Sequence, residues 1–256
     1  MNISAIILTK TGEKSIEKTI DSVSFCDEIL IVEDSLLSEG DRHNNPQIKY
    51  FNKKLNNDFA AQRNWAMEQA KNDWILFVDA DEEVTSELKK EIIEATLSSN
   101  AETAAYHIKR RDFWWGKEPR FGETMKVRNK GLIRLVKKNK GEWQGKVHEE
   151  FKVNSEKFKV KNVNGFLNHY PHPTLKEFIA DINLYSTIRA RELLEQDVQF
   201  SIFSLVLFPF GKFILNYCVY LGFLDGPAGF VYSFLMSFHS FLVRAKLFQY
   251  TRIKRT

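Results

Sequence analysis

The chain has 256 residues, of which 43% are hydrophobic and 27% are charged, and such a composition is typical of a globular protein with a substantial core. A formal net charge of +4 is too small to indicate nucleic acid as a partner, and we expect none. The two cysteines, Cys26 and Cys218, exclude a zinc-type cysteine cluster. Met1 to Ile3 lead directly into an apolar run without a basic leader, so we expect the protein on the cytoplasmic side of a cell.

Short apolar runs alternate with amphipathic segments in the first part of the chain. The predicted strands are residues 3–8, 28–32, 48–51 and 74–78, and the predicted helices begin near residues 16, 58 and 85. This alternation favours an α/β fold with a mostly parallel sheet, in which ligands bind at the carboxyl ends of the strands. Such ends hold Thr9, Lys10, Asp34, Asp79 and Asp81, so we expect these residues to converge on one site.

The acidic end of the fourth strand is the main candidate for chemistry. In extended backbone Asp79 and Asp81 point to one face and Ala80 points to the other. Two neighbouring carboxylates repel each other unless a cation lies between them, and oxygen ligands suit Mg²⁺ or Mn²⁺. The alternative is a polar turn that only ends the strand and begins a helix.

The middle of the chain is less regular. We expect strands at 104–108, 132–136, 147–151 and 165–169, and a helix from the capping box at Thr174 to about Gln196. The basic, aromatic stretch 110–120 is expected to be a loop. Arg110 and Arg111 could neutralise an anionic ligand or form a solvated surface, and Trp114 and Trp115 could stack on a ligand or pack in the core.

Residues 200–248 are dense in Phe, Leu, Val and Tyr and divide at Asp225-Gly226-Pro227, a strong turn signal. We expect an apolar helical hairpin over 198–256 that lies in one leaflet of a membrane. The cations Arg244, Lys246, Arg252, Lys254 and Arg255 would then meet anionic head groups. The alternative is a helical pair that packs on the domain or forms a homodimer.

Motifs along nearly the whole chain resemble glycosyltransferase family 2. They are Ile3–Lys10, Val32-Glu33-Asp34-Ser35, Ala61-Gln62-Arg63-Asn64 and Phe77-Val78-Asp79-Ala80-Asp81-Glu82. Trp143–Glu149 and Gly222-Phe223-Leu224-Asp225-Gly226 further resemble the branch that contains lipopolysaccharide inner-core β-1,4-glucosyltransferases. The run Glu33–Ser38 departs from the family's usual Ser-x-Ser-x-Asp pattern.

The resemblance implies a GT-A fold over residues 1–197, a UDP-sugar donor, Mn²⁺ or Mg²⁺, and inversion at the anomeric carbon. It implies that Thr9 and Asp34 bind the base or ribose, with Arg63 beside the nucleotide. Asp79-Ala80-Asp81 would be the family's DXD motif. Asp79 would lie near the ribose, and Asp81 would bind the metal. The implied acceptor is a cell-envelope glycan or glycolipid such as lipopolysaccharide core, reached from the cytoplasmic face of the inner membrane.

Inverting transfer also needs a base for the acceptor hydroxyl, and Glu149 is the candidate. A structural salt bridge is the alternative role for Glu149. His169 is a candidate metal ligand or phosphate contact, with His172 as a substitute, and a hydrogen-bonded structural histidine is as good an interpretation.

Three other functions remain open from the sequence. A sugar nucleotidyltransferase usually has a glycine-rich loop after the first strand, and residues 9–15 contain only Gly12. A membrane-bound binding module would leave the acidic strand ends without a purpose. Transfer to polyprenyl phosphate is compatible with the apolar tail.

Overall fold

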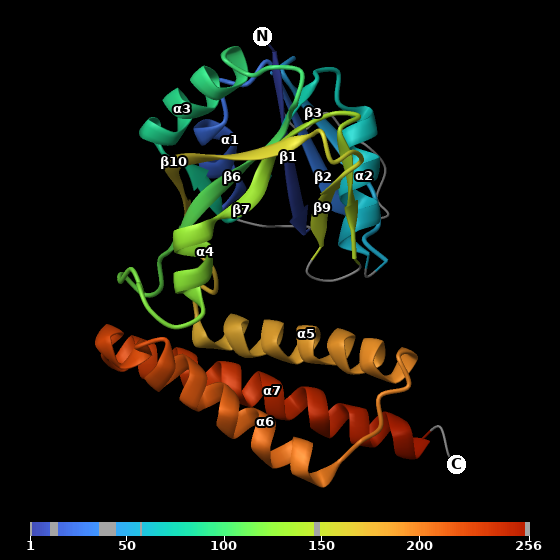
Figure 1. The fold of residues 1–256 in the computed structure, drawn as a ribbon, viewed down its shortest axis with the longest axis vertical. Helices are drawn as coiled ribbons and strands as arrows, with labels where there is room; N and C mark the ends of the chain where they lie inside the picture. The colour runs from blue at the N-terminus through green and yellow to red at the C-terminus, as the bar shows by residue number, and fades with distance from the viewer. Residues whose placement is uncertain (1, 11–14, 36–44, 57, 146–148, 254–256) are drawn as a thin grey trace. The chain divides into compact units, whose positions relative to one another are not determined.

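The computed structural model describes residues 2–10, 15–35, 45–56, 58–145 and 149–253. Contacts group the chain into two compact units (Figure 1). The sheet unit contains Met1–Arg110 and Asn129–His169, and the helical unit contains Arg111–Arg128 and Tyr170–Thr256. Residues 175–195 therefore group with the helices that follow them, while the expected division between 197 and 198 remains a prediction.

The sheet unit is an α/β fold built on one mixed sheet. Its elements are β1 (Ile3–Lys10), α1 (Ile16–Ser22), β2 (Glu28–Asp34), β3 (Ile48–Asn52), α2 (Phe59–Gln69), β4 (Trp74–Asp79), β5 (Glu82–Val84), α3 (Ser86–Leu97), β6 (Thr103–Asp112), β7 (Leu132–Lys137), β8 (Gly141–Gln144), β9 (Glu150–Val153) and β10 (Lys159–His169). The strand order is β3-β2-β1-β4-β7-β6-β10-β5, and β8 pairs with β9 separately. Strands β1 to β4 are parallel, as predicted, and the antiparallel strands lie beyond β4.

The core of this unit lies on both faces of the sheet because its central strands contain unbroken apolar runs, which are Ala5–Leu8, Ile29–Val32 and Trp74–Val78. Neighbouring residues Ile6 and Ile7 of β1 are both fully buried and belong to different core clusters. One cluster includes Leu88 and Ile92 of α3, and the other includes Ala66 of α2. Figure 1 shows α1 and α3 on one side of the sheet and α2 on the other.

Strand register brings the predicted site residues to one edge. Lys10 of β1 lies opposite Asp34 of β2, and Leu8 lies opposite Asp79 of β4. The carboxyl ends of the three central strands therefore meet, which is the expected arrangement for a ligand site in a parallel sheet.

Some predicted boundaries differ from the structure. Strand β6 continues through Arg110 and Arg111 to Asp112, so the two arginines lie in a strand and not in a loop. Strand β9 begins at Glu150, and residues 146–148 of the predicted strand lie outside the described residues. Trp114 is buried and packs against Phe178 in the helical unit, in agreement with the core interpretation of this residue.

The helical unit is made of three long helices. Its elements are α5 (Leu175–Glu195), α6 (Ile202–Ile214), a π-helix (Leu215–Val219), a 3₁₀ turn (Gly222–Asp225) and α7 (Pro227–Ile253), and α4 (Thr124–Lys130) begins in this unit. Thr174 and Glu177 form the predicted capping box. The Asp225 carboxylate at the hairpin turn accepts hydrogen bonds from the backbone N–H groups of Arg120 and Phe121.

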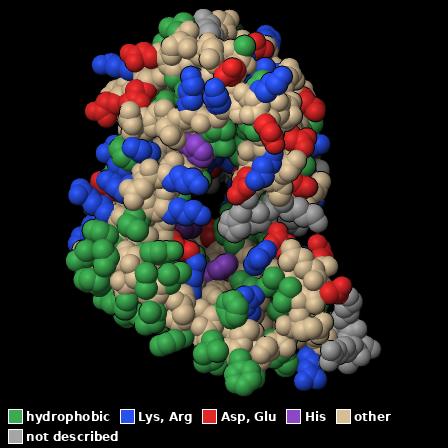
Figure 2. Space-filling model, viewed as in Figure 1, with side chains coloured by type: hydrophobic (Ala, Val, Ile, Leu, Met, Phe, Trp, Pro, Cys, Tyr) green, Lys and Arg blue, Asp and Glu red, His purple; other side chains and the backbone are tan. Residues whose placement is uncertain are grey.

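Helix α6 is apolar and mostly exposed. None of its residues, all of which the structure describes, is buried. Among the described residues, one helical stretch, Ile202–Val219, is long and apolar enough to cross a membrane by length and composition. Figure 2 shows hydrophobic side chains gathered on a face of the helical unit. The exposed large hydrophobic residues of α6 are Ile202, Phe203, Val206, Leu207, Phe208, Phe210 and Ile214.

Candidate functional site

The acidic tip of β4 has the alternation that the sequence predicts. Ala80 is buried, and its carbonyl accepts a hydrogen bond of 2.9 Å from the Thr19 hydroxyl of α1. The side chains of Asp79 and Asp81 are 32% and 35% exposed, so both remain within reach of a ligand. The turn is thus fixed from the core side, while its two carboxylates remain accessible.

Asp79 lies between two arginines. Nη2 of Arg63 donates to its Oδ1 at 3.2 Å, and Nη2 of Arg134 donates to its Oδ2. Burial raises the pKa of Asp79, but the charges of Arg134 and then Arg63 outweigh this and hold the pKa well below its usual range. Asp79 is therefore an anion at any pH near neutral.

Glu82 and Arg134 complete this network, and neither is among the residues that the sequence analysis proposes for the site. The Glu82 side chain is fully buried and accepts from Arg134 Nη2 at 2.8 Å and from the backbone N–H of Asp79 at 3.0 Å. Arg110 Nη1 lies 3.5 Å from the same carboxylate. Arg134 is 4% exposed in β7, within an otherwise apolar run. A cation at such a position needs a buried anionic partner. A lone arginine within an apolar strand was therefore the signal by which the sequence could have indicated Arg134.

Arg63 connects Asp79 with Glu149. Its Nε donates to Glu149 Oε1 at 2.8 Å, and the guanidinium carbon lies 5.2 Å and 5.0 Å from the ring centroids of Phe77 and Trp143. Arg63 is 4% exposed, and Asp58 caps the helix that carries it, close to its predicted start. The aromatic rings and the two carboxylates together fix this guanidinium, so Glu149 has a defined position in the sheet unit.

Asp81 pairs with His169, which ends β10. His169 Nε2 lies 3.3 Å from Asp81 Oδ2. Burial raises the pKa of Asp81, but its hydrogen bond to His169 and the charge of that ring outweigh burial and lower the pKa. Within the described parts of the chain, no group of three or more His, Cys, Asp and Glu side chains could hold a metal ion. Asp81 and His169 nevertheless present one oxygen and one nitrogen, which Mn²⁺ accepts.

His172 belongs to a different environment. Its ring stacks on Phe178 with centroids 4.1 Å apart, and its Nδ1 lies 3.1 Å from Asp181 Oδ2. These partners all belong to the helical unit. His172 therefore has the structural contacts that a packed histidine requires.

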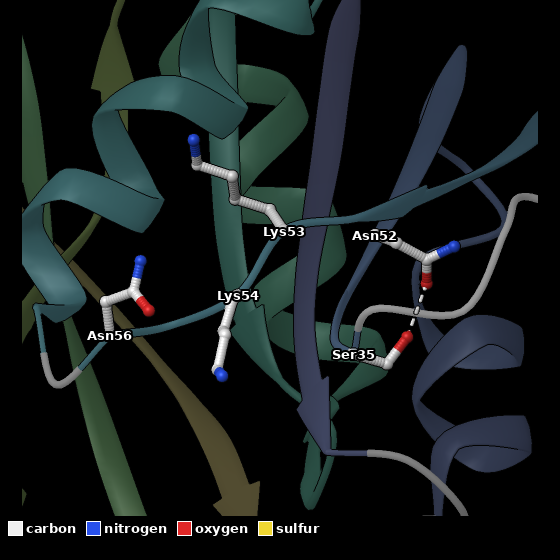
Figure 3. Close-up of a pocket in the computed structure, with 5 residues that line it drawn as sticks. All are labelled: Ser35, Asn52, Lys53, Lys54 and Asn56. Carbon is white, nitrogen blue, oxygen red and sulfur yellow. Dashed lines mark hydrogen bonds between the residues drawn. The ribbon is translucent and has the colours of Figure 1, made fainter.

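A pocket of about 250 Å³ lies at the carboxyl ends of β2 and β3 (Figure 3). It is lined by Ser35, Asn52, Lys53, Lys54 and Asn56. Ser35 Oγ donates to Asn52 Oδ1 at 2.8 Å, and Lys53 and Lys54 point in different directions from the chain. Asp34 precedes the pocket residue Ser35 in the chain, and its Oδ1 accepts a hydrogen bond from the backbone N–H of Leu55 at 2.8 Å. Thr9 Oγ1 donates to the carbonyl of Lys10 at 3.0 Å.

The sequence matches the family Glycosyl transferase family 2 over residues 4–148, more than half of the chain. The chain belongs to this family. This glycosyltransferase is 28% identical over 264 residues to an uncharacterized glycosyltransferase of Rickettsia typhi, covering 96% of this chain and 86% of the relative. It is 26% identical over 268 residues to the lipopolysaccharide core biosynthesis glycosyltransferase LpsC of Rhizobium meliloti, covering 98% and 94%.

A solved structure has the same fold. The mannosyltransferase of Pyrobaculum calidifontis, in complex with GDP-Man and Mn²⁺, superposes with a TM-score of 0.57 at 11% identity and covers 96% of this chain and 87% of that one. The prediction of a GT-A-like α/β fold is thus confirmed, and so is the prediction of a family 2 glycosyltransferase. The reaction is nucleotide-sugar-dependent glycosyl transfer. The roles of individual residues remain predictions.

Proposed function

We propose that this glycosyltransferase moves a hexose, such as glucose, from a UDP-sugar to a lipopolysaccharide core or a similar cell-envelope acceptor, with inversion and with Mn²⁺ or Mg²⁺. The observation that carries the proposal is the pair of carboxylates at the tip of β4, one held by arginines and one beside a histidine. The likeness to LpsC over nearly the whole chain supports the acceptor class. Transfer to polyprenyl phosphate is the second candidate, and the exposed apolar surface of α6 favours a lipid-linked acceptor of that kind.

Each residue has a task in this proposal. Asp34 accepts a hydrogen bond from the base or ribose, with Thr9 beside it, while Arg63 and Asp79 form the wall next to the nucleotide. Asp81 and His169 would hold the divalent cation. When bound, the cation supplies positive charge to the leaving diphosphate.

Glu149 is the proposed base. It takes the proton of the acceptor hydroxyl as the new glycosidic bond forms and the bond to the diphosphate breaks. Its salt bridge to Arg63 is the contact that the alternative, structural role of Glu149 also expects, and in this proposal the same contact holds the carboxylate in one orientation. The same guanidinium contacts Asp79, so the proposed base and the proposed donor site share one positioning group.

The helical unit is proposed to bring the enzyme to its acceptor. We place residues 198–256 at the cytoplasmic face of the inner membrane, with the exposed apolar side chains of α6 in the leaflet. The sequence analysis places Lys246 at the head groups, but in the structure this lysine is held within the helical unit. Its Nζ donates to Asn183 Oδ1, Ser186 Oγ and Thr187 Oγ1 at 2.7 to 2.8 Å, which ties α7 to α5. Lys254 and Arg255 lie outside the described residues.

A donor panel tests the reaction. Purified enzyme with Mn²⁺ is given UDP-glucose, UDP-galactose, UDP-N-acetylglucosamine or GDP-mannose, with and without lipopolysaccharide acceptor, and released nucleotide is measured. We expect acceptor-stimulated release from one UDP-sugar. Release from GDP-mannose alone, or from no donor, would contradict the proposal.

The metal role is tested with Asp81→Ala. We expect Mn²⁺-dependent binding of the UDP-sugar to weaken at least about 10-fold, with an unchanged circular dichroism spectrum. Asp73→Ala, which removes a carboxylate at the other end of β4, is the control and should leave binding unchanged. Equal Mn²⁺-dependent affinity in Asp81→Ala and the wild type would exclude Asp81 as the ligand.

A further inference from the structure

The helical unit contains a cation whose charge has no counter-ion in the described chain. Arg244 of α7 is partly buried, and its Nε is buried without a hydrogen-bond partner. Its guanidinium carbon lies 4.3 Å from the ring centroid of Phe208 in α6. Lys246, two residues further along α7, shows the contrast because it is surrounded by oxygen acceptors from α5.

A second cation increases the cost of this position. Burial lowers the pKa of Arg244, and the positive charge of Arg189 on α5 lowers it further. Arg189 itself has a carboxylate, since its Nη1 donates to Glu192 Oε2 at 2.9 Å. Arg244 thus faces an aromatic ring and a like charge, and an external anion would relieve both the missing hydrogen bond and the repulsion.

The surroundings indicate what kind of anion fits. Phe208 is 54% exposed, and its neighbours Val206 and Leu207 are more than 60% exposed. A second cation–aromatic contact lies further along α7, where the guanidinium carbon of Arg252 is 5.3 Å from the ring centroid of Phe248. A soluble phosphate would gain nothing from this apolar surface, whereas a phospholipid offers a phosphate and acyl chains together.

We infer that Arg244, with Arg189 near it, binds the phosphate of an anionic phospholipid when the apolar side of α6 lies in the leaflet. The inference rests on the membrane association proposed above and adds a specific headgroup site to it. The edge of the planar guanidinium donates two N–H groups to the phosphate oxygens, while the face of the guanidinium remains against the ring of Phe208.

Vesicle sedimentation of the full chain tests the site. Wild type, Arg244→Gln and Arg191→Gln are mixed with vesicles of phosphatidylcholine alone or of phosphatidylcholine with phosphatidylglycerol. Arg191 is an exposed arginine of α5 and serves as the matched loss of charge. We expect Arg244→Gln to lower the affinity for phosphatidylglycerol vesicles about 5-fold and Arg191→Gln to lower it less than about 2-fold.

The possible failures are distinguishable. A wild type that sediments with neither vesicle contradicts the membrane association itself. If the wild type binds vesicles and Arg244→Gln binds phosphatidylglycerol vesicles as tightly as the wild type does, only the headgroup site is overturned. Equal losses of affinity in Arg244→Gln and Arg191→Gln would overturn it as well. Displacement of the wild type by millimolar inorganic phosphate, at ionic strength matched with chloride, would assign the site to soluble phosphate instead.

Two further measurements separate binding from folding. Because the charge of Arg189 repels Arg244 when no lipid is bound, the melting temperature of Arg244→Gln should be no lower than that of the wild type. Arg244→Lys keeps the charge without the planar fork, and we expect it to recover at least half of the lost binding. A lysine variant that binds no better than the glutamine variant would contradict a role for the charge.

Discussion

At the strand ends of the sheet unit, each of three carboxylates contacts a guanidinium; they belong to Asp79, Glu82 and Glu149. In the helical unit, by contrast, Arg244 contacts the ring of Phe208 and is repelled by the positive charge of Arg189. The first region balances its charges within the chain, so its geometry is fixed before any ligand arrives. The second leaves both charge and apolar surface without partners in the described chain. A region of the first kind suits a small polar substrate, and a region of the second kind suits an extended surface such as a membrane.

The strongest test of this contrast removes the proposed base without changing its size. Glu149→Gln should lower kcat about 10²- to 10⁴-fold because the proton acceptor is lost, and the weaker contact to Arg63 should change the KM for the donor by much less. Steady-state kinetics with the donor and acceptor found by the panel provide the measurement. Glu150→Gln is the matched control, since this neighbouring carboxylate is 69% exposed. Activity above a tenth of the wild type in Glu149→Gln, or an equal loss in Glu150→Gln, would reject Glu149 as the base.

The next largest effect is expected on stability. Arg134→Met leaves the fully buried Glu82 carboxylate without its 2.8 Å partner and should cost about 3–5 kcal/mol of unfolding free energy. Urea unfolding at pH 7 measures the change. Lys159→Met breaks the exposed pair with Glu102 and should leave the midpoint unchanged. If both variants lose the same amount, the buried network does not stabilise the strand ends in the way that its geometry indicates.

The sequence predicted the strand ends well because side-chain alternation is a local property and the carboxyl ends of parallel strands share one edge. Asp79 and Asp81 share an accessible side and Ala80 turns inward, as the pleat requires. Arg134 was missed because its partners lie 52 and 55 residues away in the chain, and no spacing rule connects them. Lys246 was expected at head groups for the opposite reason. Its charge was visible, while the oxygen acceptors of α5 around it were not.

The pH dependence of stability should be smaller and should originate in the same network. The pKa of Asp79 is lowered in the folded protein, so its contribution is fully present above the unfolded pKa of about 3.9 and is lost as the pH falls below that value. Asp79→Asn removes this titration. The stability difference between wild type and Asp79→Asn should therefore be constant from pH 7 to about pH 5 and shrink towards pH 3 in urea titrations. A difference that grows on acidification would have the wrong sign for a carboxylate paired with arginines.

The smallest effect on stability is expected at the apolar surface itself. Phe203 of α6 is 73% exposed, so Phe203→Asn should change the free energy of unfolding by no more than about 0.5 kcal/mol. Its vesicle affinity should nevertheless fall several-fold, because a leaflet would bury the ring that the protein leaves exposed. Leu97→Asn at the end of α3 removes a side chain that is 62% exposed in the sheet unit and provides the control. Loss of vesicle binding in Phe203→Asn alone would identify α6 as a membrane contact, while equal behaviour of the two variants would mean that its apolar side chains are ordinary surface residues.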